Sequence, residues 1–182
     1  EGEPSMSPDS EATQLRIEPA TEDDWPWIIR GQAEIAWAGL GPERREEIDR
    51  QTVAERTAVR VARVRKDEGF PNQAFVARTL DGSPAGFVWV ARTHNDFTGQ
   101  LEASLLNQYV AEPYRGQGLG RCLMEAAEAW AREQGLPRIS LSVGAHNTIG
   151  QRLYESLGYQ VETLRMTKRL IPQEDELLLT ND

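Results

Sequence analysis

The chain has little of several features that define whole classes of protein. It contains one cysteine, Cys122, and two histidines among 182 residues. A single cysteine excludes an internal disulfide framework and a cysteine-based metal cluster. No stretch approaches the ~18 unbroken apolar residues of a membrane span, and no apolar signal region stands near the start. We therefore expect a soluble, cytoplasmic protein with no transmembrane segment and no metal site.

Positive charge is also scarce. Lysine and arginine number 20 against 29 acidic residues, which gives a net charge of −9 and a pI of about 4.9. This balance argues against nonspecific nucleic-acid binding, which needs a basic face. It does not exclude a small anionic ligand, because backbone dipoles can hold such a ligand locally.

What is present indicates one domain of ordinary size. The length and a hydrophobic fraction of 39% are sufficient for a real core. Residues 1–14 are rich in Pro, Ser and Glu and are expected to form a disordered tail. Residues 173–182 form an acidic C-terminal tail, so residues 15–172 are the expected domain. The sequence leaves both a monomer and a homodimer open.

The hydrophobic periodicities predict ten elements of secondary structure. We expect, in order, a strand at 15–19, helices at 21–37 and 42–67, strands at 74–79, 85–92 and 101–111, a helix from 119, a strand at 138–143, a helix at 149–157 and a strand at 159–170. Three strands with short turns indicate an antiparallel meander, and a βαβ crossover follows it. This order predicts a mixed α/β sheet with helices on both faces.

The most informative segment joins a strand directly to an amphipathic helix and reads VAEPYRGQGLG, residues 110–120. Its three glycines allow a ligand to come close to the backbone and free successive N–H groups at the helix start, where the dipole favours negative charge. Arg115 adds a fork of donors suited to phosphate, and Arg121 adds a second positive charge. A pyrophosphate-bearing ligand fits this segment.

Three ligand classes compete for the segment. A P-loop would end in Gly-Lys-Ser/Thr, whereas this chain has Gly120-Arg121-Cys122. A dinucleotide fingerprint needs the spacing G-x-G-x-x-G, whereas the spacing here is G-x-G-x-G, without a first βαβ unit around it. The third class is coenzyme A.

Arg115-x-x-Gly118-x-Gly120, after a strand ending in Tyr109-Val110, resembles motif A of the GCN5-related N-acetyltransferase (GNAT) family. A second segment, NTIGQRLYESLGY at residues 147–159, resembles the motif B pattern N-x-x-A-x-x-L-Y-x-x-x-G-F. Gly150 stands where the pattern has Ala, and Tyr159 where it has Phe.

The resemblance implies a GNAT-like fold that transfers an acetyl group from acetyl-CoA to an amine. In such enzymes the strand before the glycine loop splays from its neighbour, and the pantetheine chain pairs with the exposed backbone. The resemblance assigns cofactor binding to Tyr109, Val110, Ala111, Arg115, Gly116, Gln117, Gly118, Leu119, Gly120, Arg121, Asn147 and Tyr154.

The resemblance also assigns two catalytic roles. Tyr154 matches the general acid that protonates the departing thiolate, and the backbone N–H of Val110 is the donor to the oxyanion. A core tyrosine with a satisfied hydroxyl is the competing interpretation of Tyr154.

The general base is not identified by the sequence. Many relatives carry a carboxylate where this chain has Leu106 and Asn107, and neither of these can act as a base. Glu34, His94 and Glu102 stay as candidates, although for each a solvated surface position is the simpler interpretation. A water relay or an already neutral amine is the other alternative.

The acceptor amine cannot be named from the sequence. Among Trp25, Trp27, Trp37 and Trp89, we expect Trp37 to line a site and the others to belong to the core. The overall acidity favours a cationic amine. The alternative function is a non-catalytic acyl-CoA-binding regulatory module on the same fold.

Overall fold

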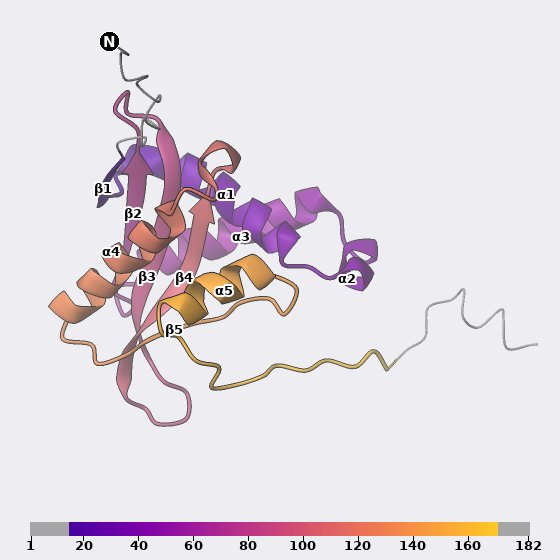
Figure 1. Cartoon of the computed structure of the whole chain (residues 1–182). Helices are drawn as coiled ribbons and strands as arrows, with labels where there is room; N and C mark the ends of the chain where they lie inside the picture. The colour runs from indigo at the N-terminus through magenta and orange to yellow at the C-terminus, as the bar shows by residue number, and fades with distance from the viewer. Residues whose placement is uncertain (1–14, 171–182) are drawn as a thin grey trace, which may run out of the picture.

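The computed structural model describes residues 15–170, so both predicted tails lie outside the described residues. A five-stranded sheet runs through the molecule in the order β1-β2-β3-β4-β5 (Figure 1). Its strands are β1 (Arg16–Pro19), β2 (Asn72–Arg78), β3 (Pro84–His94), β4 (Leu101–Val110) and β5 (Ile139–Leu141). The first four pair antiparallel, and β5 pairs parallel to β4. The predicted mixed sheet is confirmed.

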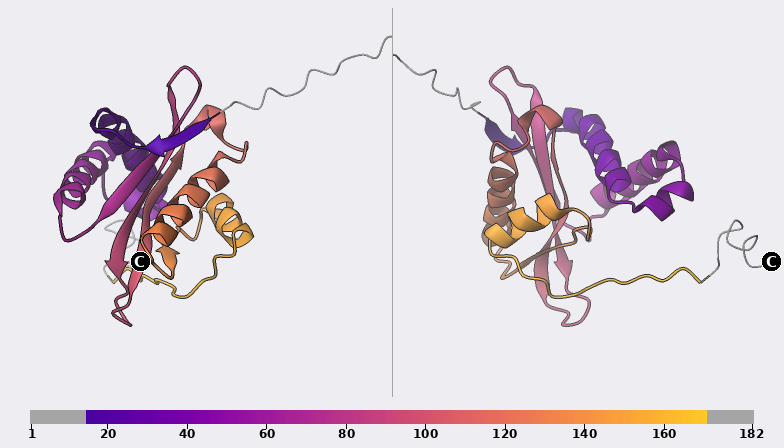
Figure 2. Two further views of the ribbon diagram at one scale, coloured as in Figure 1. Left: turned by 90° about the vertical axis from the view of Figure 1, so that its left-hand side faces the viewer. Right: turned by 45° about the vertical axis from the view of Figure 1, so that its right-hand side comes forward.

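Helices cover both faces of this sheet (Figure 2). One face carries α1 (Trp25–Ala38) and α3 (Arg50–Lys66), and the other carries α4 (Leu119–Glu133) and α5 (Thr148–Ser156). The short elements are η1 (Glu22–Asp24), α2 (Pro42–Glu46) and η2 (Glu112–Tyr114). No helix within residues 15–170 is both long enough and apolar enough to cross a bilayer.

The central strand β3 supplies both cores, because its successive side chains point to opposite faces. Phe87 and Trp89 pack with α1 and α3, whereas Val88 and Val90 pack with α4. Trp89 is 1% exposed and Trp25 is 8% exposed, as expected for core residues. The sheet is therefore held rigidly between two helical layers.

The helix predicted at 42–67 is wrong in one respect, since the structure divides it into α2 and α3. Asp49 adopts an extended conformation and caps α3, and its carboxylate accepts hydrogen bonds from the Thr52 N–H (2.8 Å) and hydroxyl (2.6 Å). A side-chain cap satisfies helix N–H groups that an uninterrupted helix would have bonded to backbone.

The strand predicted at 159–170 is also wrong, because no strand follows α5 in the part of the chain that the structure describes. The segment leaves α5 as an extended, exposed stretch (Figure 1), and Arg169 forms an ion pair with Glu47 just after α2. Alternating residues favour a strand only where a partner offers free backbone groups. β5 has three residues and offers few of them.

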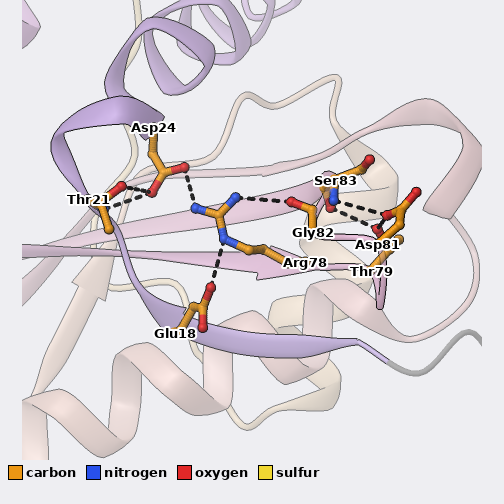
Figure 3. Close-up of polar contacts among 8 residues, drawn as sticks. All are labelled: Glu18, Thr21, Asp24, Arg78, Thr79, Asp81, Gly82 and Ser83. Atoms are coloured by element: carbon orange, nitrogen blue, oxygen red, sulfur yellow. Dashed lines mark hydrogen bonds and ion pairs between the residues drawn. The ribbon is translucent and has the colours of Figure 1, made fainter.

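An ion-pair cluster fixes the start of α1 to the sheet (Figure 3). The guanidinium of Arg78 on β2 contacts the carboxylates of Asp24 and Glu18, the latter at 2.8 Å. The Asp24 carboxylate also accepts hydrogen bonds from the N–H and hydroxyl of Thr21. This is the capping-box arrangement that the sequence predicts at 21–24.

Candidate functional site

The end of β4 has an open edge. Parallel pairing between β4 and β5 runs only from Ala103 opposite Ile139 to Leu105 opposite Leu141. On its other side β4 stays paired with β3 as far as Val110. Within residues 15–170, the last residues of β4 therefore have one backbone edge in the sheet and one edge without a strand partner.

The alternation of an antiparallel ladder decides which groups face that edge. The N–H of Ala111 donates to the carbonyl of Ala85 at 2.9 Å, so Ala111 and Tyr109 direct their N–H groups toward β3. Val110, between them, directs its N–H toward the open edge. Of the three backbone positions predicted to meet pantetheine, Val110 is thus the one with an outward N–H.

The glycine loop supplies further unpaired N–H groups on the α4–α5 face. Gly116 and Gly118 have φ angles of +74° and +83°, which L side chains rarely adopt. Gly118 is the N-cap of α4, and no side chain in the described part of the chain caps this helix. The N–H groups of Leu119 and Gly120 therefore belong to an uncapped helix start, where anions bind favourably. The N–H of Arg121 already donates to the Gly118 carbonyl at 3.0 Å.

Tyr154 lies next to this edge. Its hydroxyl donates to Oε1 of Gln108 at 3.2 Å, and Nε2 of Gln108 donates to the Gly120 carbonyl. Burial raises the pKa of Tyr154 above its usual value near 10, so the phenol is protonated at neutral pH. Gln108 was missed by the sequence reasoning. Its position two residues before Val110, on the same face of β4, is the signal that could have found it.

Two predicted cofactor residues have structural partners. Asn147 is the N-cap of α5, and its Oδ1 accepts a hydrogen bond from the Gly150 N–H at 3.0 Å. A Cβ at position 150 would lie 2.7 Å from Asn147 Nδ2, so a larger residue here would require the Asn147 amide to shift. The Arg121 guanidinium donates to Ser156 Oγ at 2.7 Å and ties α4 to α5.

A pocket of about 260 Å³ lies on the opposite face of β4. Its lining comes from three parts of the chain: α1, the start of α3, and the end of β4 with the loop after it. The residues are Glu34, Ile35, Trp37, Ala38, Arg50, Tyr109 and Arg115. Trp37 lines this pocket, whereas Trp25 and Trp89 are buried in the core and the half-buried Trp27 packs against it. That the pocket is the acceptor site stays a prediction.

Tyr109, near the end of β4, forms one wall of the pocket. Its ring stacks on Phe87 with centroids 5.6 Å apart, and its hydroxyl donates to Glu34 Oε2 at 2.7 Å. Burial and the neighbouring Glu34 carboxylate raise the pKa of Tyr109, against a smaller opposing effect of Arg115. Glu34, Tyr109 and Arg115 are therefore close neighbours.

Arg115 contacts the end of the strand that precedes the glycine loop. Its Nε donates to the Val110 carbonyl at 2.9 Å, and its side chain lines the pocket. The guanidinium thus contacts the α1–α3 side of the site. Binding of pyrophosphate by this side chain stays a prediction.

Two of the three candidate bases lie at the wrong end of the sheet. Glu102 precedes Val110 by eight residues on β4, which is roughly 26 Å along an extended strand. It is buried and accepts hydrogen bonds from Asn95 and Ser140. His94 pairs with Leu101 at the same distant end. Glu34 lines the pocket.

Asn107, at the position where relatives carry a carboxylate, belongs to a partly buried amide pair. Its Nδ2 donates to Oε1 of Gln32 at 2.8 Å, and Arg60 donates to the same oxygen at 3.2 Å. Gln32 is fully buried, and its Nε2 has no hydrogen-bond partner within the described residues. Asn107 is thus held by α1 and has no acid–base capacity of its own.

Comparison with known proteins places the chain in a family. The profile of the acetyltransferase (GNAT) family matches residues 35–159, which include the glycine loop, the open edge of β4 and α5. The chain belongs to the GNAT acetyltransferase family.

Individual relatives agree with this assignment. The mycothiol acetyltransferase of Nocardiopsis dassonvillei is 31% identical over 163 residues, which cover 87% of this chain and 48% of that protein. The chain spans about half the length of the first relatives that it matches.

Solved structures show the same fold. A Pyrococcus furiosus protein assigned as an acetyl transferase superposes with a TM-score of 0.74 at 25% identity, covering 86% of this chain and 100% of its own. AAC(6')-Iy, solved with the bisubstrate analog CoA-S-monomethyl-acetylneamine, gives a TM-score of 0.60 at 17% identity, covering 87% of this chain and 99% of its own.

Proposed function

We propose that the chain transfers an acetyl group from acetyl-CoA to a primary amine by direct attack in a ternary complex. The open edge of β4 is the observation that carries this proposal. It lies between an uncapped, glycine-rich helix start on one face and a pocket on the other. A thioester along this edge can be reached by an amine from the pocket, while the loop holds the pyrophosphate.

Each reacting atom then has a partner in the chain. The amine nitrogen attacks the thioester carbon, a C–N bond forms, and the C–S bond breaks. The Val110 N–H stabilises the oxyanion, since it points away from β3 and toward the open edge of β4. The Tyr154 hydroxyl donates its proton to the leaving sulfur and regains one from solvent. Its raised pKa keeps it protonated at neutral pH for this role.

We assign receipt of the amine proton to Glu34, directly or through water. Its carboxylate lines the pocket and accepts a hydrogen bond from Tyr109. Glu102 and His94 lie at the far end of the sheet, and Asn107 cannot accept a proton at neutral pH.

Asn107 has an amide where many relatives carry a carboxylate. This difference favours a second candidate function, an acyl-CoA-binding regulatory module without turnover. A panel of primary amines with acetyl-CoA and thiol detection separates the two functions. We expect amine-dependent release of CoA together with an acetylated amine identified by mass. Saturable acetyl-CoA binding with no amine-dependent release across the panel would support the regulatory module instead.

A further inference from the structure

The pocket proposed for the amine has the opposite charge balance from the whole chain. The chain carries a net charge of −9. The pocket lining contains two arginines, Arg50 and Arg115, and one carboxylate, Glu34. That carboxylate already accepts a hydrogen bond from the Tyr109 hydroxyl, with 2.7 Å between the two oxygens. The local field is therefore positive, although the average field is negative.

A third arginine stands at the rim. The Arg45 guanidinium lies over the Trp37 ring, 5.5 Å from its centroid, and donates to the Ala38 carbonyl at 3.1 Å. Trp37 and Ala38 both line the pocket. Arg45 thus adds positive charge at a position that the backbone and an aromatic ring hold in place.

Arg50 is the arginine most available to a ligand. It is the first residue of α3, its side chain lines the pocket, and no ion pair or hydrogen bond of its side chain is seen within residues 15–170. The adjacent carboxylate of Asp49 is occupied by the N–H and hydroxyl of Thr52. The Arg50 fork thus faces the pocket with no ion pair to a carboxylate of the described residues.

We infer that the acceptor amine also carries an oxyanion, a carboxylate or a phosphate, which binds Arg50. A guanidinium binds either group through two parallel hydrogen bonds. The volume of about 260 Å³ suits a small molecule or the end of a larger one. This inference rests on the proposed function, and it reverses the expectation of a cationic amine that the net charge suggests.

Matched pairs of acceptors test the inference. The full chain is assayed with glycine and glycinamide, with leucine and leucinamide, and with phosphoethanolamine and ethanolamine. Values of kcat/KM are expressed per neutral amine, because the members of a pair differ in amine pKa. We expect at least a tenfold preference for the oxyanion member of a pair. The pair with the larger preference distinguishes a carboxylate from a phosphate.

Two variants locate the effect. Arg50→Gln should lower the preference at least fivefold, through a higher KM for the oxyanion member. Arg56→Gln, which removes the same charge from an exposed position on α3 outside this pocket, should leave the preference unchanged. Equal use of both members of every pair by the unmodified chain overturns the inference alone. A preference that survives Arg50→Gln overturns the role of Arg50, and no transfer to any amine overturns the proposed function as well.

Discussion

The two faces at the end of β4 offer ligands different kinds of groups. On the α4–α5 face, and at the open edge of β4 beside it, the groups are mostly backbone: the N–H groups of the glycine loop and the outward N–H of Val110. On the α1–α3 face they are side chains, among them Glu34, Trp37 and Arg50. A backbone site tolerates changes of surface charge, whereas a side-chain site changes its ligand with each substitution. One fold can therefore keep a common donor and vary the acceptor.

The largest effect is expected on the backbone side. Gly118→Val places a β-branched residue at a φ of +83°, with a strain of about 1–3 kcal/mol that the loop relieves by moving its N–H groups. We expect acetyl-CoA to lose its stabilising effect on the melting temperature of this variant.

Gly99→Val is the matched control for backbone strain. Gly99 has a φ of +67° in the turn between β3 and β4, at the opposite end of the sheet from Val110. This variant should lose stability but bind acetyl-CoA normally. A folded Gly118→Val variant with normal affinity would remove the loop from the cofactor site.

The next largest effect is expected at the open edge. Tyr154→Phe removes the proton donor and keeps the ring, so the single-turnover rate should fall by about 10²–10⁴ while CoA affinity changes by a few fold at most. Because burial raises the pKa of Tyr154, the unmodified chain should not lose rate through this group between pH 7 and 9.

Tyr159→Phe is the control for the loss of a hydroxyl. Tyr159 packs edge-on against Tyr154, with ring centroids 5.9 Å apart, and donates to Glu128 at 3.3 Å. This variant should lose some stability but keep its rate per folded molecule. If Tyr154→Phe behaves in the same way, Tyr154 is a structural residue.

The Arg115→Ala variant distinguishes a role of Arg115 in acceptor binding from a role in CoA binding. Its guanidinium contacts the Val110 carbonyl and the pocket, so we expect the acceptor KM to rise about tenfold, equivalent to ~1.4 kcal/mol. Acetyl-CoA affinity should change less. The reverse result, with the loss confined to CoA and absent for a pantetheine fragment, would establish the pyrophosphate role that the motif predicts.

The smallest functional effect is expected at the start of α1. Burial alone would raise the pKa of Asp24, but hydrogen bonds from Thr21 and Arg78 outweigh it and hold the pKa below 3.8. A lowered folded-state pKa adds stability above about pH 4, and this stability is lost as the pH falls through the folded-state value. Asp24→Asn should cost about 1–3 kcal/mol of unfolding free energy at pH 7 and less in acid.

The exposed Asp81 provides the comparison for Asp24. Its pKa is also lowered, by hydrogen bonds from Thr79 and Ser83. Because Asp81 is exposed to solvent, Asp81→Asn should change the free energy of unfolding less than Asp24→Asn does. Neither variant should alter acetyl-CoA affinity per folded molecule. A change in that affinity for Asp24→Asn would show that the two faces of the sheet are not independent.

The sequence predicted the local elements that carry the candidate site. The glycine loop and the α5 motif are each contiguous, so their resemblance to the family motifs could be recognised from spacing. The pocket could not be predicted in this way, because Glu34, Arg50 and Tyr109 come from three elements that meet only in the fold. The positive charge of the pocket could not be predicted from the net charge of the chain, which is negative.

The errors in the fold arose from tertiary partners. The Asp49 cap divides a helix that periodicity alone continues, and an alternating segment after α5 stays without a strand partner because β5 is short. The contact of the Arg115 side chain with the Val110 carbonyl is a detail that no spacing rule specifies, and the role of Arg115 toward pyrophosphate stays a prediction.

Hydrogen exchange at three adjacent amides tests the central claim most directly. Without ligand, the N–H groups of Tyr109 and Ala111 should be protected by β3, and that of Val110 should exchange faster. Saturating acetyl-CoA should protect Val110 and shift the amide resonances of Gln117 to Gly120 in NMR spectra, while Tyr109 and Ala111 change little. Saturated binding with an unchanged Val110 amide would contradict the claim that the open edge of β4 holds the thioester.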